Sequence, residues 1–153
     1  MKGDEVIQAV VEYLAGQDDV VAAYLFGSHA ADRARPSSDV DIAVVLRRAD
    51  KQMRFERRLQ LMTALSDTCG CDADVIVLDD ASPILQHQVL KLGQRIYERD
   101  RQARVGFEVR AGKVYADLKP MYDLHTDELL QTIKEVGLSG RRRHHRRSTE
   151  TPR

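Results

Sequence analysis

Cysteine and long apolar runs are scarce in this sequence, and each shortage excludes a class of protein. The two cysteines, Cys69 and Cys71, lie too close together for an ordinary structural disulfide and are too few for a structural zinc site. We therefore expect reduced thiols, as in cytoplasmic proteins. No apolar run is long enough to span a membrane, and residues 1–5 do not read as a signal peptide. The sequence thus predicts a cytoplasmic protein without a membrane partner.

The chain also lacks a net charge, although its charges are unevenly distributed. Residues 141–153 hold six arginines and one glutamate, which leaves 18 basic and 23 acidic residues in the rest of the chain. An acidic body is a poor surface for a polyanion, which argues against nucleic acid as its main partner. The segment 139–153 has no apolar periodicity and is predicted to be disordered. Its Arg/His cluster could contact RNA or an acidic partner, and a solvated tail is the simpler interpretation.

Apolar patterns predict alternating strands and helices. Strands are expected at 20–26, 39–46 and 74–78, with a short edge strand at 94–97. Helices are expected after Asp4, from Lys51 to Gly70, from Ser82-Pro83 to Gly93, and over 100–137 with a kink or break at Pro120. The buried face of the second helix is predicted to consist of Phe55, Leu59, Met62 and either Leu65 or Cys69.

Two motifs at a fixed spacing carry the functional signal. Gly27-Ser28 follows the run 20–26, and Asp39-Val40-Asp41 begins the next run after ten intervening residues. A glycine lets backbone approach a phosphate closely, and Ser28 adds a hydroxyl donor beside amides at a helix start. Alternate side chains of a strand share a face, so Asp39 and Asp41 point the same way and suit Mg²⁺. The spacing predicts a phosphate cradle opposite a divalent-metal site.

A third carboxylate normally completes such a metal site. Asp74 begins the apolar run 75–78, and beside the second strand it could bind the same metal and accept the proton of an attacking hydroxyl. Asp72 has the same parity along the strand and remains the alternative. A pair of ions in this site could hold the attacking and leaving oxygens of an in-line displacement. The residues therefore predict phosphoryl-transfer chemistry.

With these motifs the chain resembles the minimal nucleotidyltransferases of the polymerase-β superfamily, whose signature is Gly-Ser, ten residues and Asp-x-Asp. Within that superfamily it is most similar to the MntA-type antitoxins of toxin–antitoxin pairs. The resemblance covers most of residues 5–138. It includes the segments 24–30, 38–44 and 74–78 and the stretch 107–120.

The resemblance implies an α/β fold, with a small mixed β-sheet backed by helices and further C-terminal helices. The nucleotidyltransferase core would occupy residues 1–98, and 99–138 would form a helical extension of the same domain. The implied nucleotide-binding residues are Gly27, Ser28 and Ser38. The implied catalytic residues, which are also the ligands of two Mg²⁺ ions, are Asp39, Asp41 and Asp74.

MntA-type enzymes transfer AMP from ATP to a tyrosine of a HepT-type toxin, which is an RNase, and the two proteins associate. The resemblance therefore implies ATP as substrate and a HepT-type toxin as partner. Two alternatives remain open. The chain could act on another acceptor, a small molecule or a tRNA, or it could be a catalytically weak module that neutralises a toxin by binding.

One departure from the family pattern bears on the second alternative. Many relatives read Gly-Ser-x-Ala-Arg-Gly, whereas this chain has Ala31 and Asp32 at the last two positions. The missing arginine removes a phosphate contact, and Asp32 adds a negative charge. Arg33 or Arg35 could compensate by turning towards the phosphates, or could simply be solvated. Self-modification is a further option for the tyrosines that also suit packing, namely Tyr24, Tyr97, Tyr115 and Tyr122.

Overall fold

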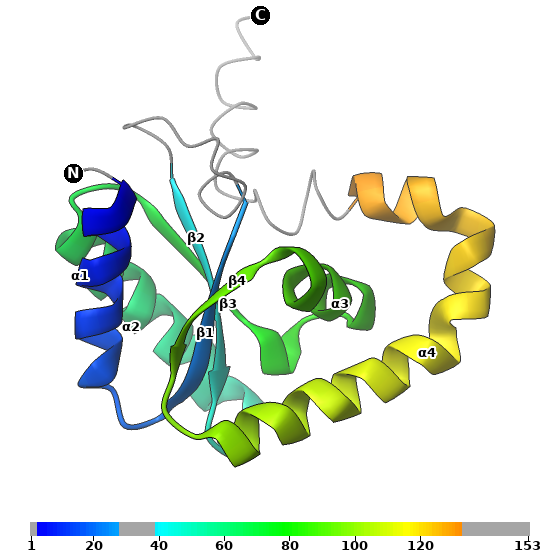
Figure 1. Ribbon diagram of the computed structural model, residues 1–153, viewed down its shortest axis with the longest axis horizontal. Helices are drawn as coiled ribbons and strands as arrows, with labels where there is room; N and C mark the ends of the chain where they lie inside the picture. Colours follow the sequence, from blue (N-terminus) through cyan, green and yellow to red (C-terminus); the bar gives the residue numbers. More distant parts are fainter. Residues whose placement is uncertain (1–2, 28–38, 133–153) are drawn as a thin grey trace, which may run out of the picture.

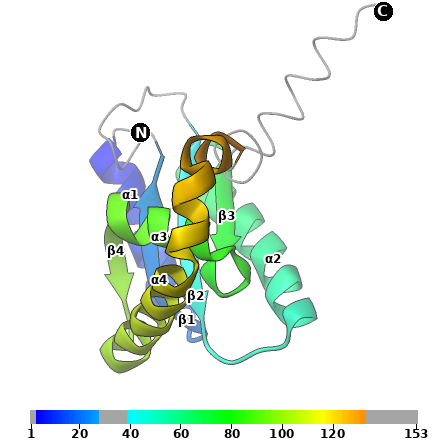
Figure 2. The same cartoon turned by 90° about the vertical axis from the view of Figure 1, so that its right-hand side faces the viewer.

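Four strands form one mixed sheet with helices on both faces in the computed structural model (Figures 1 and 2). The structure describes residues 3–27 and 39–132, the last eight of these for their backbone alone. The elements are α1 (Gly3–Ala15), β1 (Val20–Phe26), β2 (Val40–Leu46), α2 (Lys51–Cys69), β3 (Ala73–Val77), the 3₁₀ turn η1 (Leu78–Asp80), α3 (Pro83–Leu92), β4 (Gln94–Glu98) and α4 (Arg101–Thr132). The expected α/β fold with a small mixed sheet is confirmed.

The strand order is β3-β2-β1-β4, and it brings distant segments together. β1 is antiparallel to both β2 and β4, whereas β2 and β3 are parallel. A parallel pair needs a crossover connection, which α2 supplies. Consequently the end of β1 meets the beginnings of β2 and β3 at one end of the sheet, at the top of Figure 1. Of the predicted functional residues, Gly27, Asp39, Asp41 and Asp74 lie at this end.

β1 and β2 are buried on both faces and β3 nearly so, whereas β4 is exposed or half-buried, so two hydrophobic layers enclose the centre of the sheet. One layer contains Val10 and Leu14 of α1 with Leu61 and Leu65 of α2. The other contains Val89 of α3 with residues of α4. Side chains along β2 alternate between the layers: Val40, Ile42 and Val44 belong to the first, and Ala43 and Val45 belong to the second.

Local signals fix the boundaries of α2 and α3 as predicted, whereas α1 begins at Gly3 and includes Asp4, which the sequence predicts to precede it. The Asp50 side chain accepts a hydrogen bond from the Met53 amide at 2.8 Å and caps α2, which ends at Gly70 with a φ of 69°. The Ser82 hydroxyl accepts from the Leu85 amide at 3.3 Å, and proline follows at the first position of α3. All four strands lie within one residue of their predicted limits.

The predicted buried face of α2 is partly wrong. Phe55 and Leu59 are 56% and 45% exposed, whereas Leu61, Leu65 and Cys69 are buried. The inward stripe continues towards the start of the helix through Arg54 and Arg58, at the helical spacing of three and four residues. These arginines form contacts with β3 and η1, which displace the apolar side chains to the outer face.

A polar network attaches α4 to the sheet. The Tyr24 hydroxyl donates to Glu108 Oε1 at 2.8 Å, and Arg104 Nη1 donates to Glu108 Oε2 at 2.5 Å. Arg104, 8% exposed, also pairs with Glu98 of β4. Such satisfied networks rigidify a core. Further along, α4 contains Pro120 and changes direction in its second half (Figure 1), so the predicted kink occurs without a break in the helix.

Within residues 3–27 and 39–132, no helix is both long and apolar enough to cross a membrane. The basic tail 139–153 lies outside the described residues. The division at residue 98 between a core and a helical extension stays a prediction.

Candidate active site

Gly27 ends β1 in a backbone conformation that favours glycine. Its φ is +74°, and a Cβ atom placed on it would overlap the carboxylate of Asp41, lying 3.2 Å from Asp41 Cγ. The cause is the antiparallel register, which pairs Phe26 with Asp41 and puts Gly27 directly beside it. The sequence requires glycine here both for the turn and for the close approach of a carboxylate.

Asp41 and Asp74 are neighbours across the parallel β2–β3 pair. The register pairs their Cα atoms, and their side chains are directed to the face that α3 and α4 cover. Asp41 is 2% exposed and Asp74 is 9% exposed. Adjacent strands are about 4.8 Å apart, so two buried carboxylates lie side by side and repel each other. Such a pair is a recognised sign of a functional site, because burial of like charges is costly.

The other predicted site residues lie next to these strands or outside the described residues. Asp39 directly precedes β2 and is half-buried. Asp72 is exposed and lies outside β3, where its carbonyl accepts from the Val40 amide at 2.9 Å. The register therefore sets Asp74, rather than Asp72, beside Asp41. Ser28 and Ser38 lie outside the described residues, as do the variable positions Ala31, Asp32, Arg33 and Arg35.

The donor chemistry of this pair fits a hard divalent cation. Mg²⁺ prefers oxygen ligands and is commonly bound by one or two carboxylates together with water and phosphate oxygens. In the described part of the chain, however, no group of three or more His, Cys, Asp or Glu side chains is arranged to hold a metal ion. The three-carboxylate magnesium site therefore stays a prediction, for which the structure supplies an adjoining pair.

Arg58 is a site residue that the sequence reasoning missed. Its Nη2 lies 3.8 Å from Asp74 Oδ1, and its Nε donates to the Val75 carbonyl at 2.6 Å. The guanidinium is thereby oriented by backbone and offsets part of the negative charge at Asp74. The available signal was its spacing from Leu61 and Leu65, which places it on the inward face of α2.

Other reactive side chains are packed away or occupied. Tyr24 donates its hydroxyl proton to Glu108, and burial raises its pKa above the usual value, so this hydroxyl is a poor nucleophile. The ring of Tyr115 stacks on His87 with centroids 3.7 Å apart. Cys69 and Cys71 are free thiols, and burial raises the pKa of Cys69 to about 11, which makes it unreactive.

Comparison with known proteins identifies relatives of this arrangement. The family described as "Polymerase beta, Nucleotidyltransferase" matches residues 8–102. The protein adenylyltransferase MntA of Shewanella oneidensis is 29% identical over 108 residues, which cover 70% of this chain and 74% of that protein.

Solved structures share the fold. A toxin–antitoxin crystal structure with AMP-PNP superposes with a TM-score of 0.62 at 24% identity, covering 85% of this chain and 99% of the other. A tri-AMPylated Shewanella oneidensis HEPN toxin in complex with MNT antitoxin gives 0.60 at 23% identity, with 84% and 99% coverage. A minimal nucleotidyltransferase gives 0.50 at 27% identity, with 61% and 94% coverage. Because the family match spans more than half of the sequence, the chain belongs to the polymerase-β nucleotidyltransferase family.

Proposed function

We propose that this protein is the antitoxin of a toxin–antitoxin pair and transfers AMP from ATP to a tyrosine of its cognate HepT-type toxin, with Mg²⁺. The observation that carries the proposal is the buried pairing of Asp41 with Asp74 beside Gly27. The likeness to MntA supports a protein acceptor, and the related structure with AMP-PNP supports ATP as the nucleotide. The related toxin–antitoxin structures support a toxin as partner.

The reaction is an in-line displacement at the α-phosphorus of ATP. The tyrosine oxygen forms a bond to that phosphorus while the bond to the bridging oxygen of the β-phosphate breaks, and pyrophosphate leaves. Asp74 accepts the proton of the tyrosine hydroxyl. Mg²⁺, held by Asp39, Asp41 and Asp74, would supply neutralisation of the triphosphate charge.

Each chain residue near the pair has a role in this scheme. Gly27, which presents no side chain, leaves room for phosphate next to Asp41, and Ser28 and Ser38 are the proposed hydroxyl donors to it. Arg58 is a positioning residue, because its hydrogen bond to the Val75 carbonyl holds a positive charge at Asp74. Catalysis arises mainly from positioning and charge neutralisation.

The test is to incubate the protein with labelled ATP, Mg²⁺ and the toxin encoded beside it. Label should appear on a toxin tyrosine and should disappear with the Asp39→Ala/Asp41→Ala variant. Asp74→Asn should also abolish labelling, whereas Asp72→Asn should retain it, because only Asp74 is paired with Asp41. Equal labelling by the double variant would refute the proposal.

The same variants separate the alternatives. A module that acts by binding alone predicts that Asp39→Ala/Asp41→Ala still neutralises the toxin in cells. An enzyme with another acceptor predicts label on a small molecule or a tRNA in an acceptor screen, and none on the toxin.

A further inference from the structure

A second concave site lies at the opposite end of the sheet from the carboxylate pair. A cleft of about 640 Å³ opens between the end of β2, η1 and the first turns of α4. Asp41 and Arg47 are six residues apart on an extended strand, which corresponds to about 20 Å. The volume lies within the range of about 300–1,000 Å³ typical of small-molecule sites. The cleft is thus separate from the proposed catalytic centre and large enough for a ligand.

Arginines dominate the lining of this cleft. They are Arg47, Arg48, Arg54 and Arg110, and a single carboxylate, Asp79, accompanies them. The Asp79 carboxylate accepts a hydrogen bond from the Leu46 amide at 3.1 Å, and its burial raises its pKa. Asp80 and Asp100 pair with Arg54 and Arg47, so the positive charge that no described ion pair offsets is carried by Arg48 and Arg110.

Two of the arginines are committed and two are available. Arg54 binds Asp80 through two nitrogens, and Arg47 donates to the Asp18 carbonyl at 2.9 Å. Among the described residues, Arg48 and Arg110 form no ion pair or hydrogen bond. Free guanidinium groups bind phosphate in a bidentate manner, so this pair offers the fork that an anionic ligand requires.

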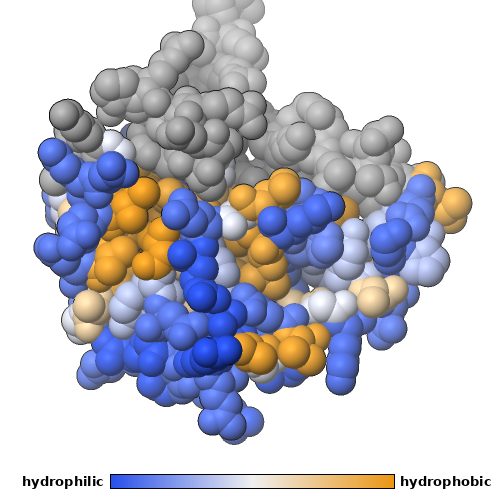
Figure 3. Space-filling model, in the orientation of Figure 1, coloured by the Kyte–Doolittle hydropathy of each residue, from blue (hydrophilic) through white to orange (hydrophobic). Residues whose placement is uncertain are grey.

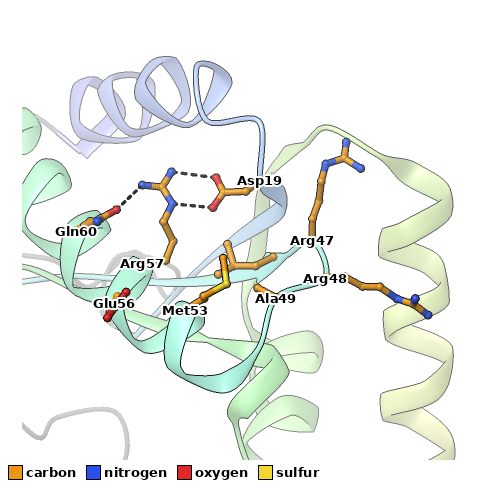
Figure 4. Close-up of a pocket in the computed structure, with 9 residues that line it drawn as sticks. Asp19, Arg47, Arg48, Ala49, Met53, Glu56, Arg57 and Gln60 are labelled. Carbon is orange, nitrogen blue, oxygen red and sulfur yellow. Dashed lines mark hydrogen bonds and ion pairs between the residues drawn. The ribbon is translucent and has the colours of Figure 1, made fainter.

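Figure 4 shows two of the four arginines, Arg47 and Arg48, at the smaller cleft beside α2. Arg57 faces Asp19 and Gln60 in the smaller cleft beside α2, which Arg47 and Arg48 also line, and the Arg48 side chain extends towards α4. From α4, Arg110 folds back over Gly106, where a Cβ atom would lie 3.3 Å from Arg110 Nη1. Gly106 thus keeps the wall of the larger cleft open, at a position where alanine would be the better helix former.

We propose that this cleft binds a small, multiply charged phosphate compound of the nucleoside polyphosphate class. The arginines would hold the phosphates, and Ala49, Gln102 and Ala103, which line the same cleft and are accessible, would contact the remainder of the ligand. A small anion meets only this local positive charge. A long polyanion would also meet the acidic body of the chain, which disfavours nucleic acid in the cleft.

The experiment is a calorimetric titration of the full chain with inorganic triphosphate in EDTA, which excludes metal-dependent binding at the carboxylates. We expect saturable binding to one site that weakens with added salt. Arg48→Ala/Arg110→Ala should weaken it about tenfold or more. The matched control is Arg101→Ala/Lys113→Ala, which removes the same charge from exposed positions of α4 outside the cleft and should leave the affinity within about twofold.

Two further variants test the position of the ligand. Gly106→Leu fills the cleft and should abolish binding, whereas Gly112→Leu, on the same helix with open space around it, should not. Asp39→Ala/Asp41→Ala should bind triphosphate normally, so the result is independent of the proposed catalytic function.

Three results would overturn the inference. One is an equal loss of affinity in the two charge-matched double variants, and another is loss of binding in Asp39→Ala/Asp41→Ala. The third is tighter, Arg48-dependent binding of an RNA oligonucleotide or a glutamate-rich peptide, which would assign the cleft to a macromolecule.

Discussion

The two ends of β2 carry opposite charges and are built in different ways. At its beginning, Asp41 is buried and fixed in register beside Asp74. At its end, the exposed Arg47 and Arg48 reach into a cleft on long side chains. Short buried side chains hold a geometry within narrow limits, which chemistry requires. Long exposed side chains adapt to a ligand instead, so the difference fits the catalysis proposed at one end and the ligand binding proposed at the other.

The largest effect is expected in the hydrophobic layer that α1 and α2 form against the sheet, which supports both ends of β2. Leu61→Ala should lower the free energy of unfolding by about 2–5 kcal/mol, because Leu61 is fully buried beneath the sheet. Leu59→Ala, two residues away on the outer face of α2, should change it by less than about 0.5 kcal/mol. Chemical denaturation measures both, and similar losses would contradict the orientation of α2.

Gly27→Ala should disrupt only the carboxylate site at the beginning of β2. The added Cβ atom displaces the Asp41 carboxylate, so toxin labelling should fall about 100-fold. Gly70→Ala is the control, because it has a similar φ of +69° with no atom within 4 Å. Both changes should cost about 1–2 kcal/mol of stability from backbone strain, but only Gly27→Ala should reduce activity. Full activity of Gly27→Ala would refute the assignment of this end.

Arg58→Ala should lower the rate of toxin labelling about tenfold, because the positive charge beside Asp74 is lost. The loss should appear in kcat with little change in the KM for ATP, because Arg58 acts through Asp74. Arg58→Lys should restore part of the rate, as it keeps the charge without the guanidinium fork. An unchanged kcat in Arg58→Ala would show that Arg58 does not position Asp74 for catalysis.

The smallest effect is expected at the basic end, from Asp79→Asn. Burial raises the pKa of Asp79, so the folded protein holds its proton more tightly than the unfolded chain. Its contribution to stability is therefore greatest in acid and is lost as the pH rises through the raised value. Asparagine cannot ionise, so it avoids the loss of stability at higher pH, and it still accepts a hydrogen bond from the Leu46 amide. Asp79→Asn should therefore stabilise the protein by less than about 1 kcal/mol at neutral pH and should not stabilise it in acid.

Thermal melts at pH 4 and pH 7 measure this difference. Asp117→Asn, at an exposed position of α4, is the control and should change neither value noticeably. The prediction would be wrong if the stability of Asp79→Asn relative to the parent protein were lower at pH 7 than at pH 4.

The strands and caps could be predicted because their signals are local. Runs such as 20–26 are continuous and rich in β-branched residues, and Asp50 and Ser82 mark helix starts by their own hydrogen bonds. The face of α2 could not be predicted from apolar residues alone. Its inward positions include Arg54 and Arg58, whose charges find partners only in the folded chain.

The same distinction holds for the two charged regions. Strand parity and a fixed spacing predict that Gly27, Asp41 and Asp74 lie together, as they do, although their roles stay predictions. Arg48 and Arg110 share no sequence pattern, since one follows a strand and the other lies on a distant helix. Only the packing of α4 across the sheet brings them to one cleft.

The hydrogen bond from Arg58 to the Val75 carbonyl has a consequence for association between molecules. β3 is an outer strand, and exposed outer strands tend to recruit strands from other chains. The guanidinium occupies an acceptor that an incoming strand would need, and its charge opposes the approach of apolar segments. Arg58 therefore protects this border from edge-to-edge aggregation.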